Sequence, residues 1–282
     1  MSYAVVKTSD YGTSNPIVAR LSVQSRQLME PFSISDEKKN RIWGILHDKL
    51  QQQLLNCYDI WSQVVSRELE IIAEVEEKGF PTQSHGRVAS IDQIENLKHL
   101  ADSFLYSAKS ALRDIKSMIC EFHESDSKKR KKLEDGSYEG LREWTKEKFG
   151  ESDDFTRLIS NDLDLWIDEV YSKRNAVEHP GGHSGHIEVS NFTAVQDSET
   201  KKWKGVIPLW KRNQNQISSI TRDMQITIEN ILNFSEDILV QCLLKSGSMV
   251  PVVFYEIEKE KRDGDCPIRL RVTLDREKLE SQ

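Results

Sequence analysis

A long stripe of apolar residues at helical spacing is the strongest constraint on what this chain can fold into. Over residues 42–72 the large apolar side chains recur every three or four positions, so they share one face of a helix: Ile42, Leu46, Leu50, Leu54, Tyr58, Trp61, Val65, Leu69 and Ile72. Ser33 or Ser35 suits the N-cap, and Gly79 and Pro81 suit the end of the helix. We expect one long amphipathic helix here.

The same spacing recurs in three later segments of the chain, over residues 91–122, 155–177 and 217–242. Ser90 is the expected cap of the second helix, and Pro180 forces a boundary at the end of the third. A shorter amphipathic piece lies at 138–150. The segment from Ser125 to Ser137 has almost no apolar residues, so we expect a solvated loop there.

Two regions have the alternating pattern of β-strands instead. Residues 186–210 hold two such runs around the polar turn "QDSETKKW", which indicates a β-hairpin inserted between the third and fourth helices. The runs "MVPVVFYEIE" and "PIRLRVTL" predict a second hairpin near the C-terminus. Four long amphipathic helices must bury their stripes against one another, so we expect a mainly α fold, an antiparallel four-helix bundle with small β additions.

The predicted organisation of the chain has three parts. Residues 1–35 read as a polar leader that is partly ordered, residues 36–249 as the helical bundle with its hairpin insertion, and residues 250–282 as a β-hairpin packed on the bundle. We see no internal repeat and no linker long enough to separate two independent domains.

Composition excludes several classes of protein. With 37% hydrophobic and 30% charged residues, the chain is typical of soluble globular proteins. A formal net charge of −7 argues against bulk coating of nucleic acid, although it allows a local basic groove. The sequence has no signal peptide and no window approaching the ~20 apolar residues of a membrane span, so we expect a cytoplasmic protein. Scattered cysteines without C-x-x-C spacing indicate reduced, structural thiols: Cys57, Cys120, Cys242 and Cys266.

The stretch "YSKRNAVEHPGGHSGH", Tyr171 to His186, concentrates the residues most suited to chemistry. On an ideal helix Arg174 and His179 point roughly 140° apart, but a helix that ends near Glu178 leaves His179 on a turn from which it can approach Arg174. Spacing alone also allows a structural interpretation. Arg174 and Glu178 form an i,i+4 ion pair, and a histidine at the helix C-terminus complements the helix dipole.

The heptapeptide "RNAVEHP" resembles the signature of the HEPN (higher eukaryotes and prokaryotes nucleotide-binding) family, in which an arginine, usually followed by a polar residue, precedes a histidine by four to six positions. Arg174, Asn175 and His179 match it position by position. The family's fold is a bundle of mainly four helices with the motif near the end of the third, where periodicity puts it here. The second helix, "FLYSAKSALRDI", also resembles its HEPN counterpart, less specifically.

The resemblance implies a metal-independent endoribonuclease that needs no cofactor and cleaves RNA by attack of the 2′-hydroxyl, of the kind found in toxin or defence systems. Arg174 would bind the scissile phosphate, His179 would be the general base or acid, and Asn175 would position them. Arginine suits a charged phosphate and histidine suits proton transfer near neutral pH. One histidine does not easily fill both roles, so a homodimer with two motifs in one cleft is expected, and an antitoxin or regulatory protein is a possible partner.

Basic residues near the motif are candidates for contact with the RNA strand. The predicted hairpin and its flank carry Trp203 together with Lys201, Lys202, Lys204, Lys211 and Arg212. The run from Lys128 to Lys132 is a second basic segment, and in a loop such a run is most often simply solvated.

Three other interpretations of the motif remain open. His179, His183 and His186, with Glu178 and Glu188 nearby, are residue types that bind zinc, although their spacing fits no common zinc motif, so we expect no metal. A HEPN-like module could also hold a nucleotide or a partner protein without chemistry. In a purely structural interpretation, the motif is a helix stop and the long first helix is an assembly surface.

Overall fold

The computed structural model describes residues 10–80, 90–213, 217–248 and 250–275. They fold mainly into helices, which confirms the predicted fold class at that level. The described residues divide into two compact units. Unit 1 takes the residues up to Leu54, those from Ser110 to Leu163 and those from Leu232 on, and unit 2 takes 55–109 and 164–231.

Unit 1 begins with a helix in the segment that we expected to be a polar leader. The helix runs through α1 (Pro16–Val18), the π-helical η1 (Ala19–Gln24) and α2 (Ser25–Met29). Asn15 caps it, because its side-chain oxygen accepts a hydrogen bond from the backbone N–H of Ile17 at 2.9 Å. Its buried face includes Ile17, Leu21, Leu28 and Met29. The segment is therefore part of the core over these residues; residues 1–9 of the predicted leader lie outside the described ranges.

The predicted first long helix is confirmed, with a π-helical turn inside it. It consists of α3 (Asp36–Gly44), η2 (Ile45–Leu50) and α4 (Gln51–Lys78). Ser35 is its cap, since its hydroxyl accepts from the N–H of Lys38 at 3.3 Å. The helix ends before Gly79, which has a φ of 71°, a conformation that glycine adopts without strain. Pro81 lies outside the described residues.

The predicted start of the second helix is wrong by about two turns. Helix α5 spans Leu97–His123, and Ser90 does not cap it. The preceding residues are held by a partner distant in the sequence: the side chain of Asn191 accepts from the N–H of Ile94 at 3.1 Å and donates to its carbonyl at 2.7 Å. The apolar spacing of Ile91 and Ile94 therefore continues a helical pattern into an extended segment.

The predicted solvated loop at residues 125–137 is also wrong, because it contains helix α6 (Ser127–Asp135). Asp126 caps this helix by accepting from the N–H groups of Lys128 and Lys129 at 2.9 and 3.0 Å. Arg130 then pairs with Glu134 at 2.9 Å one turn later. A cap and an i,i+4 ion pair stabilise a helix that has no apolar stripe for periodicity to detect.

The remaining helices follow the predictions closely. Unit 1 contains α7 (Tyr138–Phe149) and α8 (Asp154–Asp162). The π-helical η4 (Leu163–Ile167) leads from α8 into α9 (Asp168–Glu178) of unit 2, so these three elements make up the predicted third helix. The fourth is α10 (Ile220–Ser246). Within the described part of the chain, no helix is both long and apolar enough to cross a membrane.

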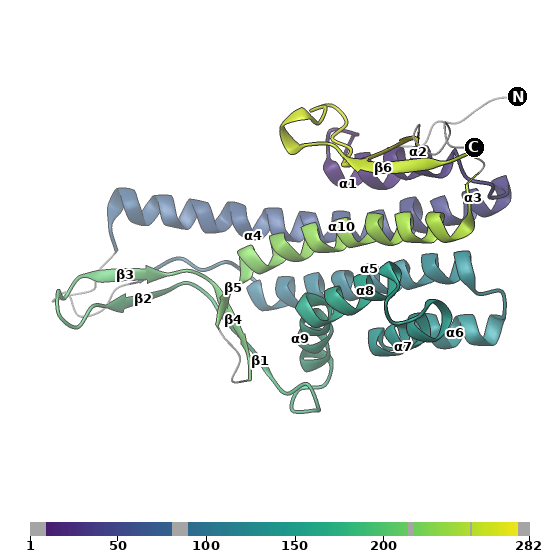
Figure 1. The fold of residues 1–282 in the computed structure, drawn as a ribbon. Coiled ribbons are helices and arrows are strands. Elements are labelled where there is room, and N and C mark those ends of the chain that lie inside the picture. Colours follow the sequence, from purple (N-terminus) through teal and green to yellow (C-terminus); the bar gives the residue numbers. More distant parts are fainter. Residues whose placement is uncertain (1–9, 81–89, 214–216, 249, 276–282) are drawn as a thin grey trace, which may run out of the picture. The chain divides into compact units, whose positions relative to one another are not determined.

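The predicted hairpin insertion is confirmed and is more elaborate than a single pair of strands. In unit 2, β1 (Ile187–Ser190) pairs antiparallel with β4 (Leu209–Arg212), and β4 pairs with β5 (Ser218–Ser219). Beyond them, β2 (Thr193–Gln196) pairs with β3 (Trp203–Val206), so that the ribbon of β1 and β4 continues outward as β2 and β3 (Figure 1).

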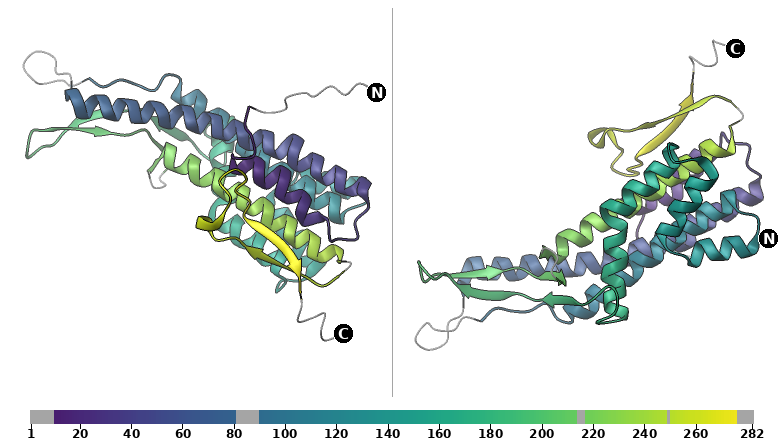
Figure 2. Two further views of the ribbon diagram at one scale, coloured as in Figure 1. Left: turned by 90° about the horizontal axis from the view of Figure 1, so that it is seen from above. Right: turned by 60° about the horizontal axis from the view of Figure 1, so that its bottom comes forward.

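The C-terminal hairpin is also confirmed, and it belongs to unit 1. Strands β6 (Val252–Glu256) and β7 (Leu270–Leu274) are antiparallel, with the short 3-10 helix η5 (Lys259–Lys261) between them. The hairpin lies beside the N-terminal helix (Figure 2), because the side-chain oxygen of Gln24 accepts from the N–H groups of Arg269 and Leu270 at 2.6 Å each. Residues 276–282 of this predicted part lie outside the described ranges.

A buried ion pair connects the N-terminal helix to α10 inside unit 1. Arg20 is 6% exposed and Glu236 is 2% exposed. The Nε of Arg20 donates to the Glu236 carboxylate at 2.6 Å, and the amide of Gln24 donates to the same oxygen at 2.6 Å. A buried charge is tolerated only when it is paired in this way, so these three polar residues are part of the core of unit 1.

Candidate functional site

The end of α9 places the histidine of the motif where the sequence predicts it. Helix α9 ends at Glu178, and His179 is the C-cap residue with φ −133° and ψ 70°. The N–H of His179 still donates to the carbonyl of Asn175 at 2.8 Å, while Pro180 prevents a further helical turn. His179 is exposed. Its imidazole is therefore accessible to a ligand.

A tight turn follows the helix and is fastened to the end of β4. The N–H of Gly181 donates to the carbonyl of Gly185 at 2.9 Å, and the N–H of His186 donates to the side chain of Asn213 at 2.8 Å. A Cβ at Gly185 would lie 2.0 Å from that asparagine oxygen, and the residue has a φ of 79°. Only glycine fits this position. The Gly-rich sequence after the motif thus builds a closed turn.

Arg174 is held by two neighbours, a carboxylate and an aromatic ring. Its Nη2 lies 3.0 Å from a carboxylate oxygen of Glu178, and its side chain is only 13% exposed. Its Cζ lies 5.5 Å from the ring centroid of Tyr106 on α5, a cation–π contact. The i,i+4 ion pair expected from the spacing is therefore formed, and the guanidinium of Arg174 contacts both Glu178 and Tyr106.

Asn175 makes its contact with α5 as well. The ammonium of Lys109 donates to the side-chain oxygen of Asn175 and to the second carboxylate oxygen of Glu178, each at 3.0 Å. The same ammonium lies 5.7 Å from the ring centroid of Tyr171. Lys109 is therefore as much a part of the site as the residues of the motif.

Glu178 is the centre of this arrangement. One of its oxygens faces Arg174 and the other faces Lys109, and its side chain remains 33% exposed. Partial burial acts to raise the pKa of Glu178, but the hydrogen bond from Lys109 and the charges of Lys109, Arg174 and His179 outweigh it and lower that pKa. One carboxylate thus lies within the field of two fixed cations and of one imidazole.

A second carboxylate faces Arg174 from α5. Burial raises the pKa of Asp102, whereas the positive charge of Lys98 and that of Arg174 act to lower it. The Oδ1 of Asp102 and the Nε of Arg174 are both buried, and neither has a hydrogen-bond partner among the described residues. Arg174 is therefore a cation with unused hydrogen-bonding capacity.

Sequence reasoning identified the three motif residues on α9 but missed those on α5. Asp102, Tyr106 and Lys109 are spaced i, i+4 and i+7, so they form one stripe that faces the motif. The sequence did contain a signal, since two charged residues and a 57% exposed tyrosine share that spacing on a face of the helix outside its apolar stripe. We read the helix for its apolar face and left this face unassigned.

The three histidines do not form a metal site. His179, His183 and His186 are all exposed. Among the residues that the structure describes, no group of three or more histidine, cysteine, aspartate or glutamate side chains is arranged to hold a metal ion. The histidine alternative from the sequence therefore has no geometric support here.

The basic residues of the hairpin separate into two groups. Lys201 and Lys202 are exposed in the turn between β2 and β3, where Lys204 pairs with Asp197 at 2.9 Å. At the other end, Arg212 is 16% exposed and pairs with Glu169 of α9 at 2.8 Å. Lys211 lies on β4 opposite Glu188. The first group lies at the far end of the ribbon, whereas Arg212 lies at the motif and is occupied by an ion pair.

Arg212 and Trp210 fasten α9 to the sheet. Arg212 also donates to the carbonyl of Ser184, in the turn after the motif, at 3.4 Å. Trp210 is buried and donates to Asp223 of α10 at 2.7 Å, and Lys173 of α9 pairs with the same carboxylate at 3.0 Å. These bonds fix the motif helix within unit 2.

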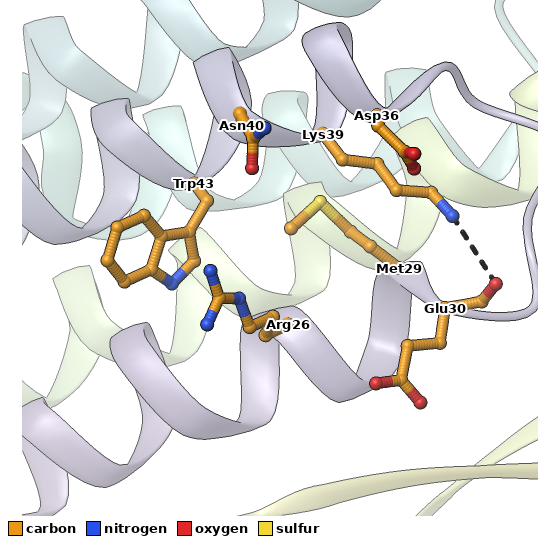
Figure 3. Close-up of a pocket in the computed structure, with 7 residues that line it drawn as sticks. All are labelled: Arg26, Met29, Glu30, Asp36, Lys39, Asn40 and Trp43. Atoms are coloured by element: carbon orange, nitrogen blue, oxygen red, sulfur yellow. Dashed lines mark hydrogen bonds between the residues drawn. The ribbon is translucent and has the colours of Figure 1, made fainter. Parts of the chain in front are cut away.

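Two hollows of unit 1 contain no motif residue. One, of about 310 Å³, lies between α2 and α3 (Figure 3). There the guanidinium of Arg26 covers the Trp43 ring at 4.8 Å, and Lys39 donates to the carbonyl of Glu30 at 3.4 Å. The other, of about 420 Å³, is lined mainly by charged and amide side chains. In the second hollow the hydroxyl of Ser117 donates to the carbonyl of Arg113 at 3.4 Å.

Comparison with known proteins adds no assignment to this geometry: no protein-family model, no curated protein and no solved structure matches the chain.

Proposed function

We propose that this chain is a metal-independent endoribonuclease of the HEPN type, with its site at the end of α9. The observation that carries the proposal is the placement of Arg174, Lys109 and the exposed His179 around a single carboxylate. Two fixed cations beside an accessible imidazole are what cleavage of a phosphodiester without a metal requires.

Each residue of the motif has a role in this proposal. Arg174 binds the scissile phosphate and stabilises the charge that builds on it in the transition state. His179 removes the proton of the 2′-hydroxyl, whose oxygen attacks the phosphorus, or protonates the departing 5′-oxygen. Asn175 positions these groups through Lys109. The products are one RNA fragment with a 2′,3′-cyclic phosphate and one with a free 5′-hydroxyl.

The finer parts of the proposal concern architecture and partners. The four long helical runs would form a HEPN-like antiparallel bundle, and a homodimer would bring a second His179 to serve as the complementary acid or base. Lys201, Lys202 and Lys204, with Lys211, would guide the RNA strand by charge. A cytoplasmic toxin or defence role, with an antitoxin or regulatory partner, accords with the resemblance of the motif.

A second candidate is a binding module that holds RNA or a nucleotide without cleaving it. The observation that favours it is that Arg174 and Lys109 are both occupied by Glu178, so that the cations are not free in this conformation. The two candidates differ in whether bound RNA is cleaved, with His179 as the catalytic group, or is only held.

The test is cleavage of end-labelled RNA in excess EDTA by the wild type and by His179→Ala. His183→Ala is the matched control, because His183 is an exposed histidine in the same turn. We expect the wild type and the control to cleave and to leave cyclic phosphate ends, and His179→Ala to lose about 10²–10⁴-fold in rate, the usual contribution of general acid–base catalysis.

Each other result contradicts the nuclease proposal in a distinct way. RNA binding without cleavage by any of the three proteins would favour the binding module. Cleavage by the wild type only when EDTA is omitted would make the reaction metal-dependent. Equal cleavage by the wild type and His179→Ala would remove His179 from the chemistry.

Arg174→Lys separates a general positive charge from the guanidinium geometry. Lysine keeps the charge but loses the fork that bonds two oxygens at once and the planar stack on Tyr106. We expect cleavage to fall about tenfold or more, since at least one charge-assisted hydrogen bond to the phosphate is lost.

A further inference from the structure

The Glu178 carboxylate presents the same groups to its surroundings as a phosphodiester does. It has two acceptor oxygens that share one negative charge, and each oxygen meets a different cation at 3.0 Å, Arg174 on one side and Lys109 on the other. Arginine and lysine are also the side chains that proteins use to bind phosphate oxygens. The position between α5 and α9 is therefore an anion site that the chain itself fills.

Both cations have a second anchor that does not depend on Glu178. The guanidinium of Arg174 lies over the ring of Tyr106, and the ammonium of Lys109 bonds to Asn175 and lies near the ring of Tyr171. These contacts hold the two positive charges in place whether or not the carboxylate lies between them.

Glu178, by contrast, is free to leave. It is the last residue of α9, the residue after it is already non-helical, and a third of its side chain is exposed. The last turn of a helix frays readily, and a partly exposed ion pair holds its carboxylate less firmly than a fully buried one does. A change of side-chain rotamer toward solvent would vacate the site without moving either helix.

We propose that Lys109 and Arg174 together form the phosphate subsite of this protein, and that Glu178 is an internal competitor that occupies the subsite until an RNA phosphate displaces it. The inference rests on the proposed function, because it assigns a phosphate ligand to the same motif. It adds Lys109 as a phosphate-binding residue and gives the glutamate next to His179 a regulatory role.

Binding of a 2′-O-methyl RNA oligonucleotide, followed by fluorescence anisotropy, tests this directly. The oligonucleotide lacks the free 2′-hydroxyl, so binding is measured without cleavage. Glu178→Gln keeps the size of the side chain and removes its charge. We expect it to bind about tenfold more tightly than the wild type, the change for about one charge-assisted hydrogen bond that no longer has to be displaced.

A matched control removes the same charge elsewhere in unit 2. Glu70 pairs with Arg67 at 2.9 Å on the exposed surface of α4, so Glu70→Gln changes the net charge equally without touching the site. We expect it to bind as the wild type does. The double variant Glu178→Gln/Lys109→Ala should lose the tenfold gain in affinity. The slope of its log binding constant against log salt concentration should also be shallower by about 0.7 than that of Glu178→Gln, the value for one phosphate contact on a single strand.

Two outcomes would overturn the inference. Unchanged or weaker binding by Glu178→Gln, with an unchanged melting temperature, would mean that the carboxylate does not compete with phosphate. A gain that persists in the double variant would remove Lys109 from the subsite. Both results are separate from the nuclease proposal, because cleavage that depends on His179 can be present or absent in either case.

Discussion

Lys109 on α5 donates a hydrogen bond to the side-chain oxygen of Asn175 on α9 at 3.0 Å. Asn175 follows the arginine of the motif, and its contact joins the motif helix to a residue 66 positions earlier in the chain. The polar residue of the motif therefore acts on Lys109. A change at Asn175 should therefore affect RNA binding through the charges of Lys109 and Arg174.

Replacing Asn175 with aspartate should weaken RNA binding. The new carboxylate would pair with Lys109 and add a negative charge next to Arg174, so that an incoming phosphate meets two internal anions instead of one. We expect binding of a non-cleavable RNA to be about tenfold weaker, as for the loss of one charge-assisted hydrogen bond. The same substitution at Asn230 of α10, which is half-buried in unit 2, is the control. Equal effects at both positions would show that only net charge matters.

An element of this structure can be predicted from the sequence when the residues that stabilise it lie near one another in the chain. Long apolar stripes, caps and the Pro180 stop are local signals, and the long helices that carry them were predicted correctly except for the start and the cap of α5. The motif was found because its residues lie within six positions of one another. Local signals of this kind can be read without knowledge of the rest of the fold.

The parts that were missed depend on residues distant in the sequence or on charge. Asn191 bonds to Ile94 across 97 positions and ends the helical pattern there. Helix α6 depends on a cap and on ion pairs rather than on an apolar face. Lys109 has its role in the site only because α5 faces α9. The distant contacts are absent from any single window of sequence, whereas the cap and the ion pair of α6 lie within one window but form no apolar stripe.

Glu236 should be among the residues on which the stability of unit 1 most depends. Its carboxylate accepts from Arg20 and Gln24 while only 2% exposed. Glu236→Ala leaves a buried arginine without its partner, so we expect the free energy of unfolding to fall by about 3–5 kcal/mol. Chemical denaturation measures this. Glu229→Ala, on an exposed position of the same helix, should cost less than about 1 kcal/mol. Similar losses for both variants would mean that the buried ion pair contributes no more to the free energy of unfolding than an exposed residue does.

His123 should make unit 1 less stable in acid. The ring is surrounded by aromatic side chains, with ring centroids of Phe149 and Phe155 at 5.3 and 6.0 Å. Burial, helped by the charges of three lysines, lowers the pKa of His123 from 6.5 to about 4. The unfolded chain therefore binds a proton near pH 6.5 that the native state does not bind until about pH 4. Across that window the free energy of unfolding falls as the pH falls, by up to about 3 kcal/mol.

His123→Phe removes the titrating group and suits the aromatic surroundings. We expect the variant to lose less stability than the wild type between pH 6.5 and pH 4.5, as measured by urea denaturation at several pH values. His99→Phe, at an exposed position of the same helix, should keep the wild-type profile. Parallel profiles for wild type and His123→Phe would show that His123 does not titrate abnormally.

Asp114, also in unit 1, should act in the opposite direction over nearly the same pH range. It is 6% exposed, and burial raises its pKa from 3.8 to about 6, against the charges of Arg113 and Lys49. The native state therefore binds a proton before the unfolded chain does, and the free energy of unfolding rises as the pH falls from about 6 to 4. Above pH 6 the buried carboxylate is charged, and its full cost of up to about 3 kcal/mol is present.

Asp114→Asn should accordingly stabilise the protein at pH 7, by up to about 3 kcal/mol, and by progressively less toward pH 4. Because His123 and Asp114 oppose each other, the profile of the wild type should lie closer to that of the double variant than the profile of either single variant does. Taken relative to the double variant, the slopes of the two single variants must have opposite signs: stability falls in acid for Asp114→Asn, which keeps His123, and rises for His123→Phe, which keeps Asp114. Slopes of the same sign would contradict the assignment of these two groups, whatever the absolute stabilities.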